Sequence, residues 1–357
     1  MSTIDRLKIL GFAVVSTAPL SLATLHQDPL VTAATALSAS MIAVTVYALV
    51  RSHWDYPGLY YYVNSVSRTL GLIQLYSWLI SYFLYVVYTV DYIDYYVLNI
   101  PDPIANALTI ALPIAFSIMV LTETSYWFIL GLALSQVVLS LPIPTLGWAF
   151  SVSRTVPAPQ TAFLNVLSSS LLIVCITLTP YIRGDSRYAR YVVYAFALSS
   201  ALMVMGSFFK PSQLVVELTS ISDAGLILAE YTALYNLLYH GLGINRVRAI
   251  VPALVIALAI ISLINYSGFY LITIYPSVAD LYLTLFIVMV ASIGYLRDWY
   301  VVPSIIASGL MLYGEYTVIS EAHGLYLYEV IAALVIPIVI GLVFRRVRGG
   351  VLREVSG

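Results

Sequence analysis

The sequence predicts an all-α polytopic membrane protein with about twelve transmembrane helices, and three observations support this fold class. Of 357 residues, 61% are hydrophobic and 9% charged, whereas roughly 25% of the residues in a soluble domain are charged. Apolar runs long enough to cross a bilayer recur along the whole chain. Lys and Arg fall almost entirely in alternate connections between these runs, which is the pattern of a multi-pass membrane protein.

Charges, prolines and glycines divide the chain into the expected spans. Their ranges are 8–25, 30–50, 70–97, 103–121, 125–142, 161–181, 189–208, 221–240, 248–266, 271–296, 299–319 and 326–344. The longest connections, 51–69, 143–160 and 209–220, are too short for a separate soluble domain. The near-neutral balance of 16 basic and 17 acidic residues argues against a nucleic-acid partner.

The distribution of Lys and Arg predicts the orientation in the bilayer. With a cytoplasmic N-terminus, 14 of the 16 basic residues lie inside, and Arg154 and Lys210 lie outside. One missing helix would scramble this alternation, so we expect an even number of spans in the cell membrane, with both termini in the cytoplasm. The first span resembles a signal peptide in its basic start and apolar run, but we expect it to be retained as a transmembrane helix.

The first span, 8–25, is interrupted near its middle by Ser16-Thr17-Ala18-Pro19. Pro19 has no backbone N–H, so a carbonyl one turn earlier loses its donor. In lipid, a broken backbone persists only where protein or a water-filled cavity covers it, and broken helices of this kind mark binding sites. A simple proline kink is the alternative interpretation.

The sixth span, 161–181, mixes hydroxyl residues and a proline in the same way, with three serines at 168–170 and the stretch from Cys175 to Pro180. The first and sixth spans run in opposite directions, and each begins a block of five. We therefore predict an inverted repeat formed by 1–142 and 161–296, followed by two additional helices and a tail in 299–357. Taken singly, each hydroxyl is expected to bond back to its own helix.

Glu230 lies near the middle of the eighth span. A charged carboxylate at this depth costs several kcal/mol unless it faces the bundle interior, finds a partner or takes up a proton. We expect either an ion-coupling group that binds a proton or cation, or a protonated acid that bonds between helices.

Other polar residues in the spans have simpler expected roles. Asp91 and Asp94 lie among tyrosines at the end of the third span, which favours an interfacial belt with solvated acids over a vestibule that attracts cations. Asp280 is likewise expected to be solvated. Ser135 and Gln136 in the fifth span are expected to bond between helices.

Signatures of enzymes and cofactor sites are absent from the sequence. It contains no His-Glu-x-x-His, Gly-x-Ser-x-Gly or nucleotide-binding Gly-x-x-x-x-Gly-Lys-Ser/Thr motif. The four histidines, His26, His53, His240 and His323, fall in different loops and helix ends. The sequence therefore predicts no catalytic residue, no cofactor and no metal site.

One stretch, 57–98, carries a resemblance to a known family. It places a Pro-Gly pair and tyrosines before the third span and a Leu-Gly pair at its start. The matching residues are Pro57, Gly58, Tyr60, Tyr62, Val63, Leu70 and Gly71. In these residues the chain resembles the amino acid, polyamine and organocation superfamily of permeases, and the likeness extends more faintly to 233–244 and 294–298.

The resemblance implies a five-plus-five inverted-repeat core with two extra helices, alternating access, and substrate at the unwound centres of helices one and six. One substrate molecule would contact both helices. Backbone around Ser16, Thr17, Ala18 and Pro19 would meet its carboxylate, and Cys175, Ile176 and Thr177 would meet its amino group.

The sequence thus predicts a secondary-active permease for amino acids or related small amine-bearing solutes, with Glu230 as the candidate ion-coupling residue and a proton or cation as the candidate coupling ion. Two alternatives remain open: a polytopic membrane enzyme that acts on a lipid or isoprenoid head group, and a non-transporting membrane subunit in which Pro19 is only a kink.

Overall fold

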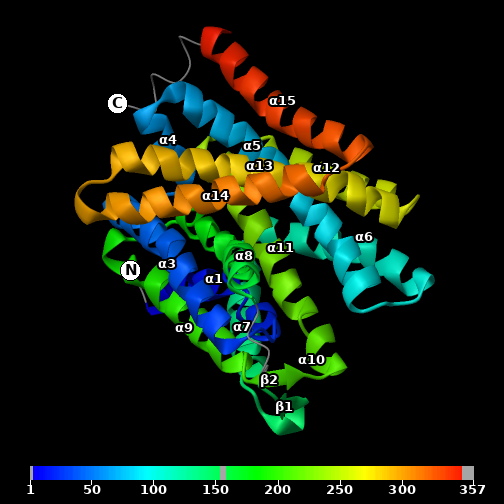
Figure 1. The fold of residues 1–357 in the computed structure, drawn as a ribbon. Coiled ribbons are helices and arrows are strands. Elements are labelled where there is room, and N and C mark those ends of the chain that lie inside the picture. The colour runs from blue at the N-terminus through cyan, green and yellow to red at the C-terminus, as the bar shows by residue number, and fades with distance from the viewer. Residues whose placement is uncertain (1–2, 153–157, 348–357) are drawn as a thin grey trace.

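The computed structural model describes residues 3–152 and 158–347, and each of the twelve predicted spans contains helix in it (Figure 1). The first five spans comprise α1 (Thr3–Val15) with α2 (Pro19–Ala23), α3 (Pro29–Ser52), α5 (Arg68–Asp91) with the π-helix η1 (Tyr92–Val97), α6 (Asp102–Leu121) and α7 (Ser125–Leu139). The next five comprise α8 (Pro159–Ser170) with the 3₁₀-helix η3 (Leu171–Tyr181), α9 (Arg190–Gly206), α11 (Ser220–Tyr235) with the π-helix η5 (Asn236–Gly241), α12 (Val247–Ser262) and α13 (Tyr266–Tyr295). The last two are α14 (Val301–Glu321) and α15 (Leu325–Val347).

Short elements connect the spans. They are α4 (Leu59–Val66), η2 (Pro144–Leu146), β1 (Trp148–Phe150), η4 (Ser186–Tyr188), β2 (Phe209–Pro211), α10 (Gln213–Glu217) and η6 (Asp298–Tyr300). The two strands pair antiparallel, with Ala149 opposite Lys210. They join the connection after the fifth span to the connection after the seventh.

The long helices are apolar enough to span a membrane. Among the described residues, 8 helical stretches of 18 residues or more have the hydropathy of a membrane span, and two shorter apolar helices, α7 and α12, accompany them. In α5 and α13, 61% and 67% of the apolar window is buried, whereas in α15 the share is 22%. The centre of the bundle is therefore the α5–α13 pair, and α15 lies at the periphery.

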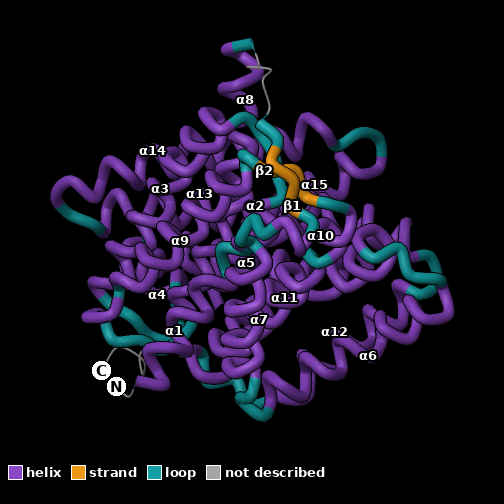
Figure 2. The backbone as a smooth tube through the Cα atoms, turned by 90° about the horizontal axis from the view of Figure 1, so that it is seen from below, coloured by secondary structure: helices purple, strands orange, loops and turns teal. Residues whose placement is uncertain are grey.

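Peripheral helices present their apolar side chains outward, as lipid contact requires. Ile104 and Ile118 of α6 are each 57% exposed, and Ile260 and Ile261 of α12 are about half exposed. Figure 2 shows α6 and α12 side by side at one edge of the molecule. The chain is thus an all-α polytopic membrane protein whose peripheral helices present apolar side chains outward.

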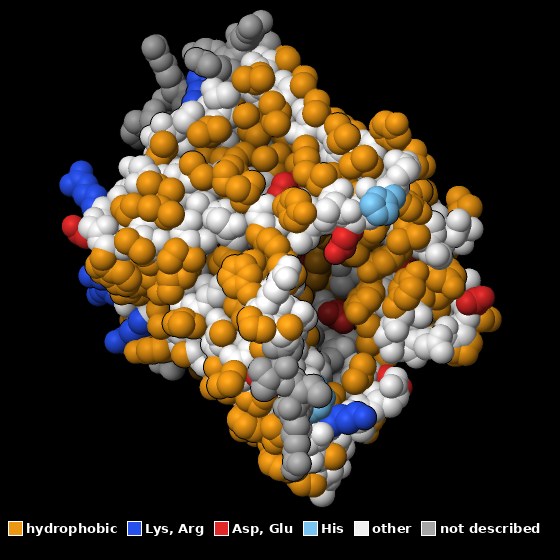
Figure 3. Space-filling view, viewed as in Figure 1, with side chains coloured by type: hydrophobic (Ala, Val, Ile, Leu, Met, Phe, Trp, Pro, Cys, Tyr) orange, Lys and Arg blue, Asp and Glu red, His pale blue; other side chains and the backbone are white. Residues whose placement is uncertain are grey.

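One end of the bundle, which carries the start of α1 and is here called the N-terminal face, gathers the basic residues. The guanidinium of Arg6 lies 4.8 Å from the ring of Tyr188, and Arg51 donates to the Tyr300 hydroxyl over 3.2 Å. The first contact joins the start of α1 to η4, directly before α9, and the second joins the end of α3 to η6, directly before α14. In Figure 3, most visible Lys and Arg side chains lie along the left edge, and hydrophobic side chains cover the middle.

Residues of the 57–71 motif form the tight packing at this face. Gly58 has a φ of +56°, and a Cβ there would lie 2.3 Å from the ring of Tyr181. A Cβ on Gly71 would lie 2.9 Å from Asn64 of α4. Pro57-Gly58 thus ends the turn after α3 and lets η3 approach, while Gly71 lets α5 pack closely on α4.

Candidate functional site

The first span is broken where the sequence predicts it. α1 ends at Val15, and Ala18 adopts the left-handed conformation with φ 44° and ψ 57° before Pro19 begins α2. A non-glycine residue in this region costs roughly 1–2 kcal/mol, so the surrounding packing must hold the break in place. Ser16 and Thr17 are fully buried, which excludes a kink exposed to lipid.

The break leaves backbone groups free. In the described part of the chain, no hydrogen bond reaches the carbonyls of Ser16 and Thr17, and none leaves the N–H groups of Leu20 and Ser21. Unpaired backbone groups in an apolar interior are costly, and nearly all native groups find a partner. Two acceptors and two donors are therefore available to a ligand at the break.

The side chains at the break face their own helix. Ser16 Oγ donates to the Phe12 carbonyl over 2.8 Å, and Thr17 Oγ1 donates to the Val14 carbonyl over 2.8 Å. Thr17 also shares a hydrogen bond with Ser199 of α9. The hydroxyls thus behave as expected for isolated residues, and the backbone is the part of this segment that is free to bind.

The sixth span changes helix type where the first is broken. After Ser170 the chain leaves the α-helix and continues for 11 residues as the 3₁₀-helix η3, whereas 3₁₀ runs longer than three or four residues are uncommon and often mark hinges. The expectation of an unwound centre in this span is therefore wrong: the backbone is drawn out into a narrower helix. All residues of η3 except Leu172 are buried, and their backbone groups pair within the 3₁₀-helix.

The predicted residues of the sixth span take different positions. Thr177 Oγ1 donates to the Val174 carbonyl over 2.6 Å, and Ile176 lies in the apolar core. Cys175 contacts the eighth span, with its Sγ 3.7 Å from Glu230 Oε1. Of these three residues, Cys175 is the one whose side chain reaches the candidate ion-coupling residue.

Glu230 is fully buried on α11. One carboxylate oxygen accepts from the Cys175 thiol, and the other has no hydrogen-bond partner among the described residues. Tyr82, Tyr85 and Tyr88 of α5 lie close enough to Glu230 to interact with its charge. The carboxyl group therefore sits in an aromatic surrounding without a basic partner in the part of the chain that is described.

The helices that carry the break and Glu230 are neighbours, since α1, η3 and α11 contact one another. Gly225 of α11 lies against Val15, the last residue before the break, and a Cβ on Gly225 would be 3.0 Å from the Val15 side chain. Glu230 follows Gly225 by five positions, which is roughly 7.5 Å along the helix and about 140° around it. The carboxyl group thus lies nearer the N-terminal face than the break does, on a different face of α11 from the one that contacts Val15.

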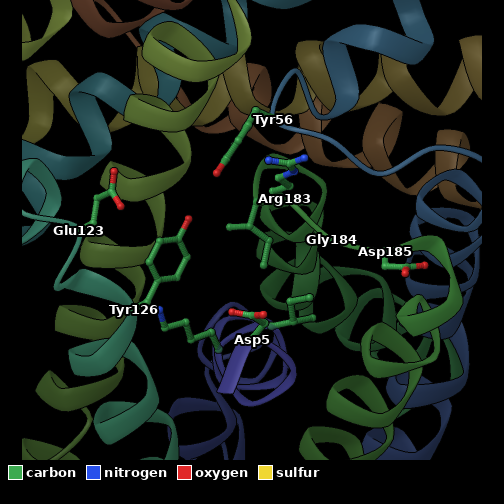
Figure 4. A pocket seen from close by; sticks show the side chains of 10 residues that line it. Asp5, Tyr56, Glu123, Tyr126, Arg183, Gly184 and Asp185 are labelled. Atoms are coloured by element: carbon green, nitrogen blue, oxygen red, sulfur yellow. The ribbon is translucent and has the colours of Figure 1, made fainter. Parts of the chain in front are cut away.

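A cavity of about 580 Å³ opens at the N-terminal face (Figure 4). Its walls come from the start of α1, the Tyr56 turn, the start of α7 and the loop after η3, and Tyr56 and Tyr126 point toward each other across it. The charged residues in its walls are Asp5, Lys8, Glu123, Arg183 and Asp185. The sequence alone does not predict this cavity, because its residues meet only when four separate segments fold together.

Two residues of this cavity titrate differently from free side chains. Hydrogen bonds from Arg187 lower the pKa of Asp185 to about 2, and the two side chains pair at 2.6 Å. Burial raises the pKa of Tyr56. Asp185 therefore stays ionised, and the positive charge of Arg187 balances it. In Figure 4 Asp185 points away from the cavity.

A polar contact that includes Tyr126 lies at the wall of this cavity. Asn236 Nδ2 donates to the Tyr126 hydroxyl over 2.9 Å and to the Tyr181 carbonyl over 3.1 Å. The Asn236 amide thus connects the eighth span to the start of the fifth span and to the end of the sixth. We call Tyr126, Tyr181 and Asn236 the inner latch. A space of about 30 Å³ beside it, lined by Thr232 and His240 among others, is large enough for one water molecule.

Several expectations about polar residues are corrected by the packing. Asp91 and Asp94 are fully buried, because α12 and α6 cover the end of the third span and supply Ser262 and Thr109 as donors. The prediction of a solvated acidic belt is therefore wrong. The prediction of a solvated Asp280 is also wrong, since this residue is fully buried between helices.

Ser135 and Gln136, the polar pair of the fifth span, have different partners. Ser222 of α11 donates to the Gln136 side-chain carbonyl over 3.0 Å, which confirms the predicted bond between helices. Ser135 donates instead to the Gly131 carbonyl of its own helix and is exposed, so the prediction is wrong for this residue.

Two of the four histidines, His53 and His240, stack on tyrosine rings. His53 stacks on Tyr61 with ring centroids 4.0 Å apart, and His240 stacks on Tyr56 at 4.6 Å. Across the described residues, no group of three or more His, Cys, Asp and Glu side chains converges.

Comparisons with known proteins identify the fold. Neither a protein-family model nor a curated protein matches the sequence. Three crystal structures of mutants of the Eremococcus coleocola manganese transporter are similar to this chain, each with a TM-score of 0.54, 13% sequence identity, and coverage of 95% of this chain and 92% of that chain. At this identity the likeness concerns the fold alone, and the chain therefore has the all-α polytopic fold seen in a membrane transporter.

Proposed function

We propose that this chain is a secondary-active membrane transporter that moves a small amine-bearing or amino-acid-like solute by alternating access. The observation that carries the proposal is the buried break at Ser16–Ala18, with its free backbone groups. The helix that carries Glu230 contacts α1, the helix that ends at this break. A break of this kind persists in a membrane where the freed groups serve a ligand or line a cavity. The transporter fold of the neighbours supports the same function.

The chemistry of the region suits a cationic amine. An ammonium group has three N–H donors and a positive charge, for which the Glu230 carboxylate and the carbonyls of Ser16 and Thr17 are suitable partners. The tyrosines of α5 near Glu230 add aromatic faces, which attract cations when desolvated. A carboxylate on the same solute would meet the free N–H groups of Leu20 and Ser21.

The proposed mechanism uses the broken first span and the sixth span with its 3₁₀-helix. Residues 1–142 and 161–296 act as inverted repeats, and their relative motion exposes the solute to the N-terminal face or to the opposite face. We propose that the inner latch, which borders the cavity at the N-terminal face, closes access to the interior from this face in the present conformation. A proton on Glu230 is the proposed coupling ion, since a carboxyl group at this depth changes its solvation and partners when the spans move.

A divalent metal ion is the second candidate substrate, because the structural neighbours are manganese transporters and because Cys175 and Glu230 combine a thiol with a carboxylate. The amine-bearing solute is preferred, since no third His, Cys, Asp or Glu joins this pair within the described ranges.

Uptake by the purified protein in reconstituted vesicles tests the proposal. The vesicles receive labelled amino acids, labelled polyamines and other amines, and labelled Mn²⁺, each with and without an inward pH gradient. We expect uptake of one amine-bearing class, accelerated by the gradient and absent from protein-free vesicles. Uptake of Mn²⁺ alone would establish the second candidate, and uptake of no solute would contradict transport.

A further inference from the structure

A second buried polar cluster lies between α5 and α13, away from Glu230. Its four members, Gln74, Ser77, Asp280 and Thr284, are all 0% exposed. Ser77 Oγ donates to Asp280 Oδ1 over 2.8 Å, and Gln74 Nε2 donates to Thr284 Oγ1 over 3.1 Å. Thr284 Oγ1 in turn donates to the Gln74 backbone carbonyl over 2.9 Å. The two helices run antiparallel, so successive turns of each bring these residues together in two adjacent layers.

Two oxygens in this cluster lack partners. Asp280 Oδ2 and Gln74 Oε1 are buried and accept no hydrogen bond in the described structure. Leaving such acceptors unsatisfied costs roughly 1–3 kcal/mol each, and more for a charged group. Both orphan atoms are acceptors, so the missing partner is a donor or a cation.

The charges around Asp280 favour a cation. Among the described residues, no Lys, Arg or His pairs with it. Glu315 of α14 lies within its electrostatic range, and neither carboxylate oxygen of Glu315 has a hydrogen-bond partner in the described ranges. The region therefore has two acidic groups, Asp280 of α13 and Glu315 of α14, and no basic partner for Asp280 among the described residues, which in a low-dielectric interior is strongly attractive to a cation.

We propose that Asp280, Gln74, Ser77 and Thr284 form a binding site for one monovalent alkali cation, with sodium as the physiological ion. The ligands are the Asp280 carboxylate, the Gln74 side-chain carbonyl and the two hydroxyl oxygens. A set of oxygens alone selects hard cations over transition metals. The single carboxylate among the four ligands matches one positive charge.

Sodium in this site would act on the inner latch through Gln74. Gln74 Nε2 also donates to the Tyr181 hydroxyl over 3.4 Å, and the Tyr181 carbonyl accepts from Asn236. A cation that fixes the Gln74 amide therefore fixes the end of η3 and favours the closed latch. This consequence rests on the proposed transport function, whereas cation binding itself does not.

Binding is tested on the purified full chain in detergent, without solute. Equilibrium binding of ²²Na⁺ is measured together with the thermal unfolding midpoint in sodium chloride and in choline chloride at equal ionic strength. We expect saturable binding of about one ion and a midpoint that rises with sodium alone, because an ion that binds only the folded state stabilises it. Asp280→Asn should abolish both effects. Ser77→Ala, which keeps every charge, should raise the half-saturating sodium concentration roughly tenfold, equivalent to about 1.4 kcal/mol.

Asp91→Asn is the matched control, since Asp91 is a fully buried aspartate on the other end of α5 that also accepts from a serine. It should bind sodium as the wild-type chain does. The proposal is overturned if the wild-type chain shows no sodium-specific binding, as a permanently protonated Asp280 would require, or if Ser77→Ala and Asp280→Asn bind sodium with wild-type affinity. Because no solute is present, a failure of transport would leave this result unchanged.

Discussion

At the scale of single residues, Glu230 has the largest expected effect on function. It is fully buried with one oxygen unpartnered among the described residues, so its proton occupancy must change with its surroundings if the ion couples to transport. Glu230→Gln keeps the size and the hydrogen-bonding capacity but removes the titration. We expect gradient-driven uptake to fall at least tenfold while solute exchange across equal pH continues.

The control for this substitution is Glu217→Gln on α10, which lies at the opposite end of the bundle and hydrogen-bonds with Gln213. It should leave both uptake and exchange at wild-type rates. An unaltered pH dependence of uptake in Glu230→Gln would remove the coupling role of this residue.

Gly58 tests the packing of the motif that carried the family resemblance. Gly58→Ala forces a Cβ into the ring of Tyr181 at a backbone φ of +56°. We expect a loss of about 3 kcal/mol in the free energy of unfolding, from the steric clash together with the strain of the left-handed conformation. Thermal or denaturant unfolding in detergent measures it.

Gly243→Ala separates the two causes, because Gly243 has a similar φ of +68° but no atom within 4 Å of its Cβ position. It should cost only about 1 kcal/mol, the part due to φ. Equal losses in the two variants would mean that contact with Tyr181 contributes nothing.

At the scale of elements, the inner latch determines access from the N-terminal face. Asn236→Ala removes the donor that holds Tyr126 and the end of η3, so the route to Cys175 should open more often. Cys175 is the only cysteine of the chain and is buried. Its rate of alkylation by a small maleimide should rise roughly tenfold in Asn236→Ala.

Asn245→Ala, on the exposed loop before α12, is the control on the same face and should leave the rate unchanged. A rate in Asn236→Ala equal to that of the wild-type chain would show that the latch does not limit access.

The break of the first span could be predicted from the sequence, because Pro19 lacks an N–H and hydroxyl residues precede it. The 3₁₀ form of η3 could not, since Leu171 to Leu178 contains no proline or glycine that would mark a change of helix type. In the structure η3 packs against the first, second and eighth spans, which lie far from it in the sequence. The partners of Asp91 and Asp280 could not be predicted from the sequence either, because Ser262 is 171 residues from Asp91 and Ser77 is 203 residues from Asp280.

At the scale of the whole molecule, the alternation of basic residues predicts that the N-terminal face is cytoplasmic. The structure brings Arg6, Arg51 and Arg248 to aromatic partners at that face, while Lys210 lies in β2, beyond the start of α11. Arg154, the other basic residue expected on the outer side, falls outside the described residues. We therefore expect Lys210 to be extracellular, and single cysteines introduced in a Cys175→Ser background report this.

Lys210→Cys should react with a membrane-impermeant reagent in intact cells, and Asn245→Cys should react only after the membrane is permeabilised. The reverse pattern would invert the orientation, and labelling of both in intact cells would mean that the eighth span does not separate the two positions across the membrane.

In the proposed transport cycle, the break in the first span, Cys175 and Glu230 surround the solute. Protection of Cys175 from alkylation by a solute that the protein transports measures this arrangement. We expect the solute to slow labelling in the wild-type chain in a saturable manner and to give no protection in Glu230→Gln. Labelling that stays equally fast at saturating solute would contradict this arrangement.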